Sequence, residues 1–146
     1  MSNKTITMLK KHEGLELYPY EDTVGKTTIG YGHNIDDNGI SQEIAEALLV
    51  SDLHAVQIEL TATFDWYYSK FPWPIELDEV RKSVIDNMAF NMGVPRLKTF
   101  KKMIQAMEDK DYEEAANQML DSKWADQVKG RAIELSDMMR TGKWLT

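Results

Sequence analysis

The amino-acid sequence predicts an α+β fold that is mostly helical and contains one small antiparallel sheet. Apolar residues recur at helical spacing over most of the chain, whereas the stretch before residue 41 has the β-branched and turn-prone pattern of short strands. The 146 residues suffice for one domain, which can narrow into two lobes. With 42% hydrophobic residues, the chain has enough apolar side chains for a packed core.

The first forty residues are expected to form a short helix followed by the sheet. Residues 5–12 carry apolar side chains on one side, and Gly14 can end that helix. The segments LELYPY, EDTVGK and TTIGYG, over residues 15–32, predict an antiparallel hairpin or meander. A sheet of this size is too small to be stable alone.

A long helix is expected next. IDDNG is a turn signal, and Ser41 can cap the helix that follows it. The apolar residues that recur along this helix are Ile44, Leu48, Leu49, Leu53, Val56 and Leu60. The FPWP segment at 71–74 interrupts helical structure, because proline lacks an N–H donor and disfavours helical geometry in the residue before it.

The second half of the chain predicts further helices. One is expected to end at Gly93 with a left-handed cap, and Asp111 with Glu114 three residues later forms a capping-box-like start for YEEAANQML. Residues 124–139 are expected to be helical as well. The apolar stripes of the first two helices consist of Val80, Val84, Ile85, Met88, Ala89 and Met92, and of Phe100, Met103, Ile104 and Met107.

The net charge of −7 is unevenly distributed. Residues 1–40 carry −2, residues 41–80 carry −7 and residues 81–146 carry +2. This balance argues against nucleic-acid binding, because neutralisation of phosphates supplies most of the sequence-independent affinity. The basic cluster of the second half is expected to be a solvated helix face rather than a polyanion site. It consists of Arg96, Lys98, Lys101 and Lys102.

Composition also restricts the chemistry. The absence of cysteine excludes disulfides, thiolate nucleophiles and Cys-based zinc sites. The three histidines lack the spacing of metal ligands, so we expect neither a metal nor another cofactor. The N-terminus lacks the apolar core of a secretory signal, and no run approaches the roughly 18 apolar residues of a membrane-spanning helix. No stable membrane insertion is expected.

Two acidic residues near the predicted hairpin could divide the work of acid and base. Glu13 follows an apolar helix, where burial against protein would keep it protonated as a general acid. Asp22 lies in a turn, where water and local hydrogen bonds would keep it ionised as a base or charge stabiliser. Glycoside hydrolysis needs this division, and the Thr28 hydroxyl could hold the attacking water. The spacing alone leaves open that these are solvent-facing charges of a hairpin.

The same residues resemble the signature of the phage-type lysozymes, the muramidases of glycoside hydrolase family twenty-four. In that signature a Glu is followed nine positions on by an Asp, then six further by the Thr of a TIGxGH turn. Glu13, Asp22 and the segment Thr28-Ile29-Gly30-Tyr31-Gly32-His33 match it without a gap. The resemblance continues through the segments NMAFNMG at 87–93, EAA at 114–116, SKW at 122–124, Arg131, and RTGKW at 140–144.

The resemblance implies a two-lobed lysozyme-like fold in a single domain. In that fold a helix over residues 1–14 packs on the C-terminal lobe, and residues 15–40 form the β lobe. Residues 41–62 form the connecting helix, and residues 63–146 the helical lobe. The region after His33 is shorter than in the best-known relatives, so the chain reaches the connecting helix quickly.

The resemblance also implies an activity, namely hydrolysis of the β-1,4 bonds between N-acetylmuramic acid and N-acetylglucosamine in bacterial peptidoglycan. Glu13 would donate the proton, and Asp22 and Thr28 would position the water. Inversion at the anomeric carbon requires the two carboxyl groups to lie roughly 6.5–9.5 Å apart, against about 5 Å in a retaining enzyme.

Further residues match family positions with binding or supporting roles. Arg131 would pair with the catalytic Glu, although it could instead be a surface cation, and His33 would form a structural ion pair with Asp52. Core packing is a rival interpretation for two of the positions that would bind substrate, Phe90 and Met103. The substrate-binding positions are Asn34, Phe90, Asn91, Met103 and Gln118.

Two other readings remain open at this point. A muramidase-like domain could bind peptidoglycan or serve as a scaffold without turnover, and a lytic transglycosylase would form anhydro-sugar ends without water. A phage enzyme of this kind is expected to be a monomer that stays in the host cytoplasm until it is released to the cell wall.

Overall fold

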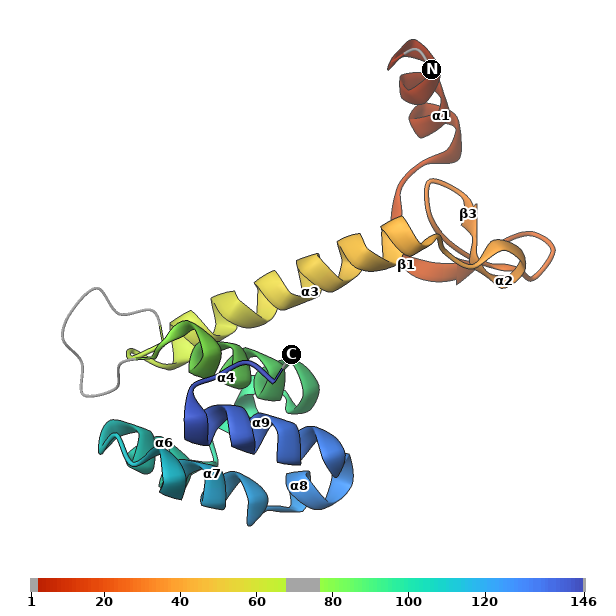
Figure 1. Ribbon diagram of the computed structural model, residues 1–146. Coiled ribbons are helices and arrows are strands. Elements are labelled where there is room, and N and C mark those ends of the chain that lie inside the picture. Colours follow the sequence, from red (N-terminus) through yellow and green to blue (C-terminus); the bar gives the residue numbers. More distant parts are fainter. Residues whose placement is uncertain (1–2, 68–76, 146) are drawn as a thin grey trace. The chain divides into compact units, whose positions relative to one another are not determined.

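The structure, a computed structural model, describes residues 3–67 and 77–145. The described chain is mostly helical with one small antiparallel sheet, which confirms the predicted α+β class (Figure 1). It divides into two compact units, Met1–Leu48 and Leu49–Thr146. The predicted break at 71–74 lies outside the described residues.

The first unit begins with α1, Asn3–Glu13. Its end is set by Gly14, which adopts a φ of 72° and donates its N–H to the Lys10 carbonyl at 3.0 Å. The predicted glycine stop is therefore confirmed, since positive φ is easily adopted only by glycine. Glu13 is consequently the last helical residue before the chain turns into the sheet. That residues 1–14 pack on the C-terminal lobe stays a prediction.

The sheet has the strand order β1-β2-β3, with antiparallel pairing throughout. The strands are β1 at Glu16–Glu21, β2 at Thr27–Gly30 and β3 at His33–Asn34. Tyr20 lies opposite Thr28 in the first pair, and Thr28 lies opposite Asn34 in the second. The meander expected from residues 15–32 is thus confirmed, and it places Thr28 on the central strand.

The IDDNG segment forms a short helix, α2 at Ile35–Asn38, in place of the expected turn. Asn34 caps it, because its side-chain oxygen accepts the Asp37 N–H at 3.0 Å. The long helix α3, Gln42–Thr63, begins as predicted at Ser41, whose hydroxyl oxygen accepts the Ile44 N–H at 3.2 Å. The boundary between the two units falls within α3.

The second unit continues with helices that pack around one apolar core. Helix α7 packs against α6 and α9. The helices after α3 are α4 Glu79–Met92, α5 Val94–Leu97, α6 Lys101–Glu108, α7 Tyr112–Leu120, α8 Lys123–Val128 and α9 Gly130–Thr141. The predicted cap of α7 is confirmed, since the Asp111 carboxylate accepts the Glu114 N–H at 3.1 Å. Methionine and aromatic side chains share the core with Leu, Val, Ile and Ala, and the most buried of them are Met88, Met107, Met119, Met139 and Trp124.

Two details differ from the local expectations. Gly93 ends α4 with a φ of 90° and a ψ of 148°, so it is not in the left-handed helical conformation. It also precedes α5, and its extended ψ lets the chain leave one helix and start the next at once. Residues 124–139 form two helices rather than one, because the chain turns at Lys129, where φ is 50°.

Arg81 joins the start of α4 to the end of α9. Its Nε donates to the Met139 carbonyl at 2.6 Å and its Nη2 to the Arg140 carbonyl at 3.1 Å, which satisfies carbonyls that a helix end leaves unpaired. The Nη1 atom pairs with Asp78 at 2.9 Å, and the guanidinium lies 3.6 Å from the centroid of the Tyr112 ring. The side chain is only 13% exposed, so these contacts are shielded from water.

We expect Arg81→Lys to lower the free energy of unfolding by about 1.5–3 kcal/mol, since one ammonium group cannot reproduce the planar fork that serves both carbonyls and Asp78. Urea denaturation should show a lower midpoint with an unchanged slope. Arg96→Lys is the control, because Arg96 makes one exposed hydrogen bond to Gln127. Equal midpoints for the two variants would contradict this role of Arg81.

Within residues 3–67 and 77–145, no helix is both long enough and apolar enough to cross a membrane.

Candidate active site

Glu13 lies against the turn between β2 and β3. A Cβ atom at Gly32 would lie 2.7 Å from the Oε2 atom of Glu13 and 3.3 Å from its Cδ atom. Gly32 also has a φ of 76°, a conformation that residues with side chains rarely adopt. The backbone conformation therefore favours glycine at position 32, and a larger residue there would have to displace the Glu13 carboxyl group.

Asp22 holds the turn that joins β1 to β2. Its Oδ1 atom accepts the backbone N–H groups of Val24 and Lys26, each at 2.9 Å. Its own N–H donates to the Lys26 carbonyl at 2.9 Å. Aspartate favours such turns because its short carboxylate can bond to nearby backbone donors. The carboxylate is thereby held in one orientation, with the Oδ1 atom occupied by the turn.

Thr28 lies on the central strand and is only 3% exposed. Its hydroxyl donates to the Lys26 carbonyl at 2.9 Å. A hydroxyl has one proton to donate and two lone pairs that accept. Because the proton is used within the protein, the oxygen can act toward a ligand or water only as an acceptor.

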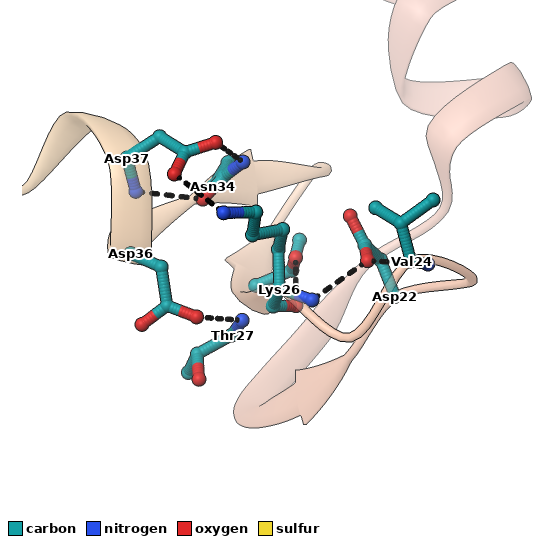
Figure 2. Close-up of polar contacts among 8 residues, drawn as sticks. Asp22, Val24, Lys26, Thr27, Asn34, Asp36 and Asp37 are labelled. Carbon is teal, nitrogen blue, oxygen red and sulfur yellow. Dashed lines mark hydrogen bonds and ion pairs between the residues drawn. The ribbon is translucent and has the colours of Figure 1, made fainter.

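The peptide groups of Lys26 hydrogen-bond to both Asp22 and Thr28, and Figure 2 shows the contact with the Asp22 carboxylate. The Lys26 carbonyl accepts from both residues, and the Lys26 N–H donates to the Asp22 carboxylate. Two of the three residues of the predicted site thus share one backbone position. Sequence reasoning did not single out Lys26, because its role is played by backbone atoms that any residue carries.

The second unit brings together two of the predicted substrate-binding residues. Met103 of α6 and Gln118 of α7 line the same cavity, which has a volume of about 460 Å³. Met103 is 1% exposed and belongs to the core, which agrees with the alternative interpretation of Met103 as a core-packing residue. The cavity also has aromatic walls, since Phe100 and Trp124 meet edge to face with their centroids 6.3 Å apart.

Four cations line that cavity as well, together with the carboxylate of Asp121. These cations are Arg96, Lys101, Lys102 and Lys123. Arg96, Lys101 and Lys102 belong to the basic cluster that we expected to be a solvated face, and Lys101 and Lys102 are indeed exposed. The structure adds that their exposed side chains border a concave surface.

Phe90 and Asn91 lie at the end of α4. Phe90 is 39% exposed and is not part of the buried core. The Asn91 side-chain oxygen accepts the indole N–H of Trp124 at 2.8 Å. Asn91 is therefore tied to a residue that lines the cavity, and its part in substrate binding stays a prediction.

The remaining predicted residues have partners within their own units. Arg131 donates from Nε to the Asn87 side-chain oxygen at 2.8 Å, and the His33 Nε2 atom lies 2.6 Å from the Gly39 carbonyl oxygen. The Asn34 side chain makes two hydrogen bonds to Asp37. Its oxygen accepts the Asp37 N–H at 3.0 Å, and its NH2 group donates to the Asp37 carboxylate at 2.9 Å. The pairing of Arg131 with Glu13 and that of His33 with Asp52 would each join the two units, and both stay predictions.

Comparison with known proteins finds one matching family and several similar proteins. Residues 10–140 match the family described as Phage lysozyme. The chain is 32% identical to "Probable T4-type lysozyme 1" of Dictyostelium discoideum, over 92% of each chain. It is 28% identical to the "Endolysin" of Acyrthosiphon pisum secondary endosymbiont phage 1, over 96% of this chain and 90% of that protein.

A third relative is much longer. The chain is 32% identical to the "Pre-baseplate central spike protein Gp5" of Enterobacteria phage T4, with 92% of this chain matching 27% of that protein. The same fold unit therefore occurs both as a nearly whole protein and as one part of a larger one. Because the family match runs through both structural units and most of the chain, this protein belongs to the phage lysozyme family.

Proposed function

We propose that this glycoside hydrolase cleaves the β-1,4 bond between N-acetylmuramic acid and N-acetylglucosamine in bacterial peptidoglycan. Glu13 protonates the leaving oxygen, and Asp22 accepts a proton from the attacking water that Thr28 helps to hold. The observation that carries this proposal is the arrangement around Lys26, which holds the Asp22 carboxylate and the Thr28 hydroxyl by one backbone position.

The hydrogen bonds of the two residues suit a water nucleophile. The Thr28 proton is used on the Lys26 carbonyl, so the Thr28 oxygen can accept a hydrogen bond from one of the two protons of the water. The Asp22 Oδ1 atom accepts two backbone N–H groups, which leaves Oδ2 to accept the other water proton. A water that donates both protons points a lone pair away from them, toward the anomeric carbon. This arrangement favours inversion, a mechanism that requires a separation of roughly 6.5–9.5 Å between the carboxyl groups of Glu13 and Asp22.

The second unit supplies the glycan-binding surface in this proposal. Met103 and Gln118 line a cavity whose wall includes the partly exposed ring of Phe100, an apolar surface on which a sugar ring can pack. Asn34, Phe90 and Asn91 complete the proposed contacts. The cations around the cavity give local attraction to an anionic wall despite the net charge of −7, and this attraction should weaken with salt.

Three residues support this site without touching the reacting atoms. Arg131 pairs with Glu13, and His33 pairs with Asp52 between the sheet and α3. We further propose that the enzyme works as a monomer without cofactor or nucleic acid. In a phage it waits in the host cytoplasm until it reaches the wall.

The products formed from purified peptidoglycan test this function. Incubation in water enriched in heavy oxygen should release new reducing ends, and mass spectrometry should find the label in N-acetylmuramic acid termini. Anhydro-sugar termini without label would identify a transglycosylase instead. A protein that pellets with the wall and releases no termini would be a binding domain, and either result would overturn the proposal.

A further inference from the structure

The central strand continues past the end of its neighbour. Strand β3 pairs Asn34 with Thr28 and His33 with Ile29, and the next position in this register would set Ile35 opposite Thr27. Ile35 is already the first residue of α2, so the strand cannot continue there. The Thr27 N–H would have no strand partner on this side, and it donates instead to the Asp36 Oδ2 atom at 2.7 Å (Figure 2).

The Asp36 carboxylate therefore takes the place of the strand carbonyl that would otherwise accept the Thr27 N–H. A hydrogen bond from a backbone N–H to an ionised carboxylate is shorter and stronger than one to a neutral carbonyl. Helix α2 is fixed at its start by the Asn34 cap, which keeps Asp36 at a defined distance from β2.

A second contact joins α2 to the same segment, but it bonds to a side chain and not to the backbone of β2. The Lys26 ammonium pairs with Asp37 at 3.0 Å, and the two side chains are 43% and 52% exposed. Exposed ion pairs contribute little, because water and salt screen them and two long side chains lose freedom. Of the two acidic residues of α2, we therefore expect Asp36 to have the larger influence on β2.

The segment that Asp36 holds is the one that orients the proposed catalytic groups. Thr27 lies between Lys26 and Thr28 in the chain. The Lys26 carbonyl, which is in the same peptide group as the Thr27 N–H, accepts hydrogen bonds from both Asp22 and Thr28. Movement of the Thr27 peptide would therefore shift both groups at once. Misplacement of reacting groups by about 1 Å can cost roughly 100-fold in rate, even when it is caused by a residue far from the chemistry.

We propose that Asp36 is a positioning residue, whose carboxylate holds the Thr27 amide and through it the relative placement of Asp22 and Thr28. This inference rests on the proposed function, because it assumes that these two residues bind the attacking water. Asp36 itself does not touch the water or the substrate.

The test compares Asp36→Ala with Asp36→Asn and Asp37→Ala. We expect Asp36→Ala to lower kcat by about tenfold or more, with KM within about twofold of wild type, because orientation of the water and not glycan binding is affected. The asparagine oxygen can still accept the Thr27 N–H, so Asp36→Asn should restore most of kcat. Asp37→Ala removes the ion pair with Lys26 and the contact to the Asn34 NH2 group, but the Asp37 N–H can still bond to the Asn34 cap, so kcat should stay within about twofold of wild type and any effect through Asn34 should appear in KM.

A direct structural measurement accompanies the kinetics. Amide hydrogen exchange at Thr27 should be faster in Asp36→Ala than in wild type, and close to wild type in Asp36→Asn. The proposal is overturned if Asp36→Ala has wild-type kcat under conditions where it is folded, or if Asp36→Asn is as impaired as Asp36→Ala.

Failure of this inference can be separated from failure of the proposed function. If Asp22→Ala and Glu13→Gln are inactive while Asp36→Ala turns over normally, the catalytic assignment stands and only the role of Asp36 is wrong. If Asp22→Ala itself keeps wild-type kcat, the proposed function fails regardless of the result at Asp36.

Discussion

Glu13→Gln is expected to lower kcat for peptidoglycan hydrolysis by at least about 100-fold, because it removes the proton donor proposed for the leaving oxygen. The substituted side chain has nearly the same size and shape, so it should still fit beside Gly32. The melting temperature should therefore stay within about 3 °C of wild type, since little packing is lost. Turbidity clearance of permeabilised Gram-negative cells and release of reducing ends would measure the first effect, and thermal unfolding the second.

The two measurements are needed together. A variant that is inactive and also unfolded at the assay temperature would say nothing of proton donation, whereas an inactive variant with a wild-type melting temperature supports it. Retention of more than about a tenth of wild-type kcat by folded Glu13→Gln would contradict the assignment, because general acid catalysis supplies more than that.

Gly32→Ala should impair activity almost as strongly, although residue 32 has no side chain that could react. The new methyl group would occupy a position 2.7 Å from the Glu13 Oε2 atom. The tip of a Glu side chain is flexible, so it would move aside and leave its position relative to the substrate. We expect kcat to fall by about tenfold to 100-fold, consistent with the cost of displacing a catalytic group by about 1 Å.

Gly30→Ala is the matched control for this experiment. Gly30 has a φ of 72°, close to the 76° of Gly32, and a Cβ atom there would meet nothing within 4 Å. Both variants should lose about 1–2 kcal/mol of stability, because an alanine in this conformation is strained. The variant at position 32 alone should lose kcat. Equal activity of the two variants at equal stability would show that contact with the Glu13 carboxyl does not matter.

The sequence alone was sufficient for the features that depend on residues close together in the chain. The Gly14 stop, the Ser41 cap and the Asp111 cap each join groups within four residues of one another, and all three are confirmed. Helical spacing of apolar residues identified the main helices and the buried faces of α4 and α6, whereas Ile44, Leu48 and Leu49 of the α3 stripe are exposed. The spacing of Glu13, Asp22 and Thr28 indicated the phage lysozyme family, which the comparisons then confirmed.

Only the tertiary structure decided which distant residues meet. Glu13 lies against Gly32, Thr27 bonds to Asp36 because β3 is too short to reach it, and Arg81 bonds to a carbonyl 58 residues away. None of these pairs has a sequence signal of its own, since a glycine, an aspartate or an arginine is compatible with many environments. What selects the partner is the direction in which each folded segment points its donors and acceptors, and buried or strand-edge groups must then find whichever partner lies there.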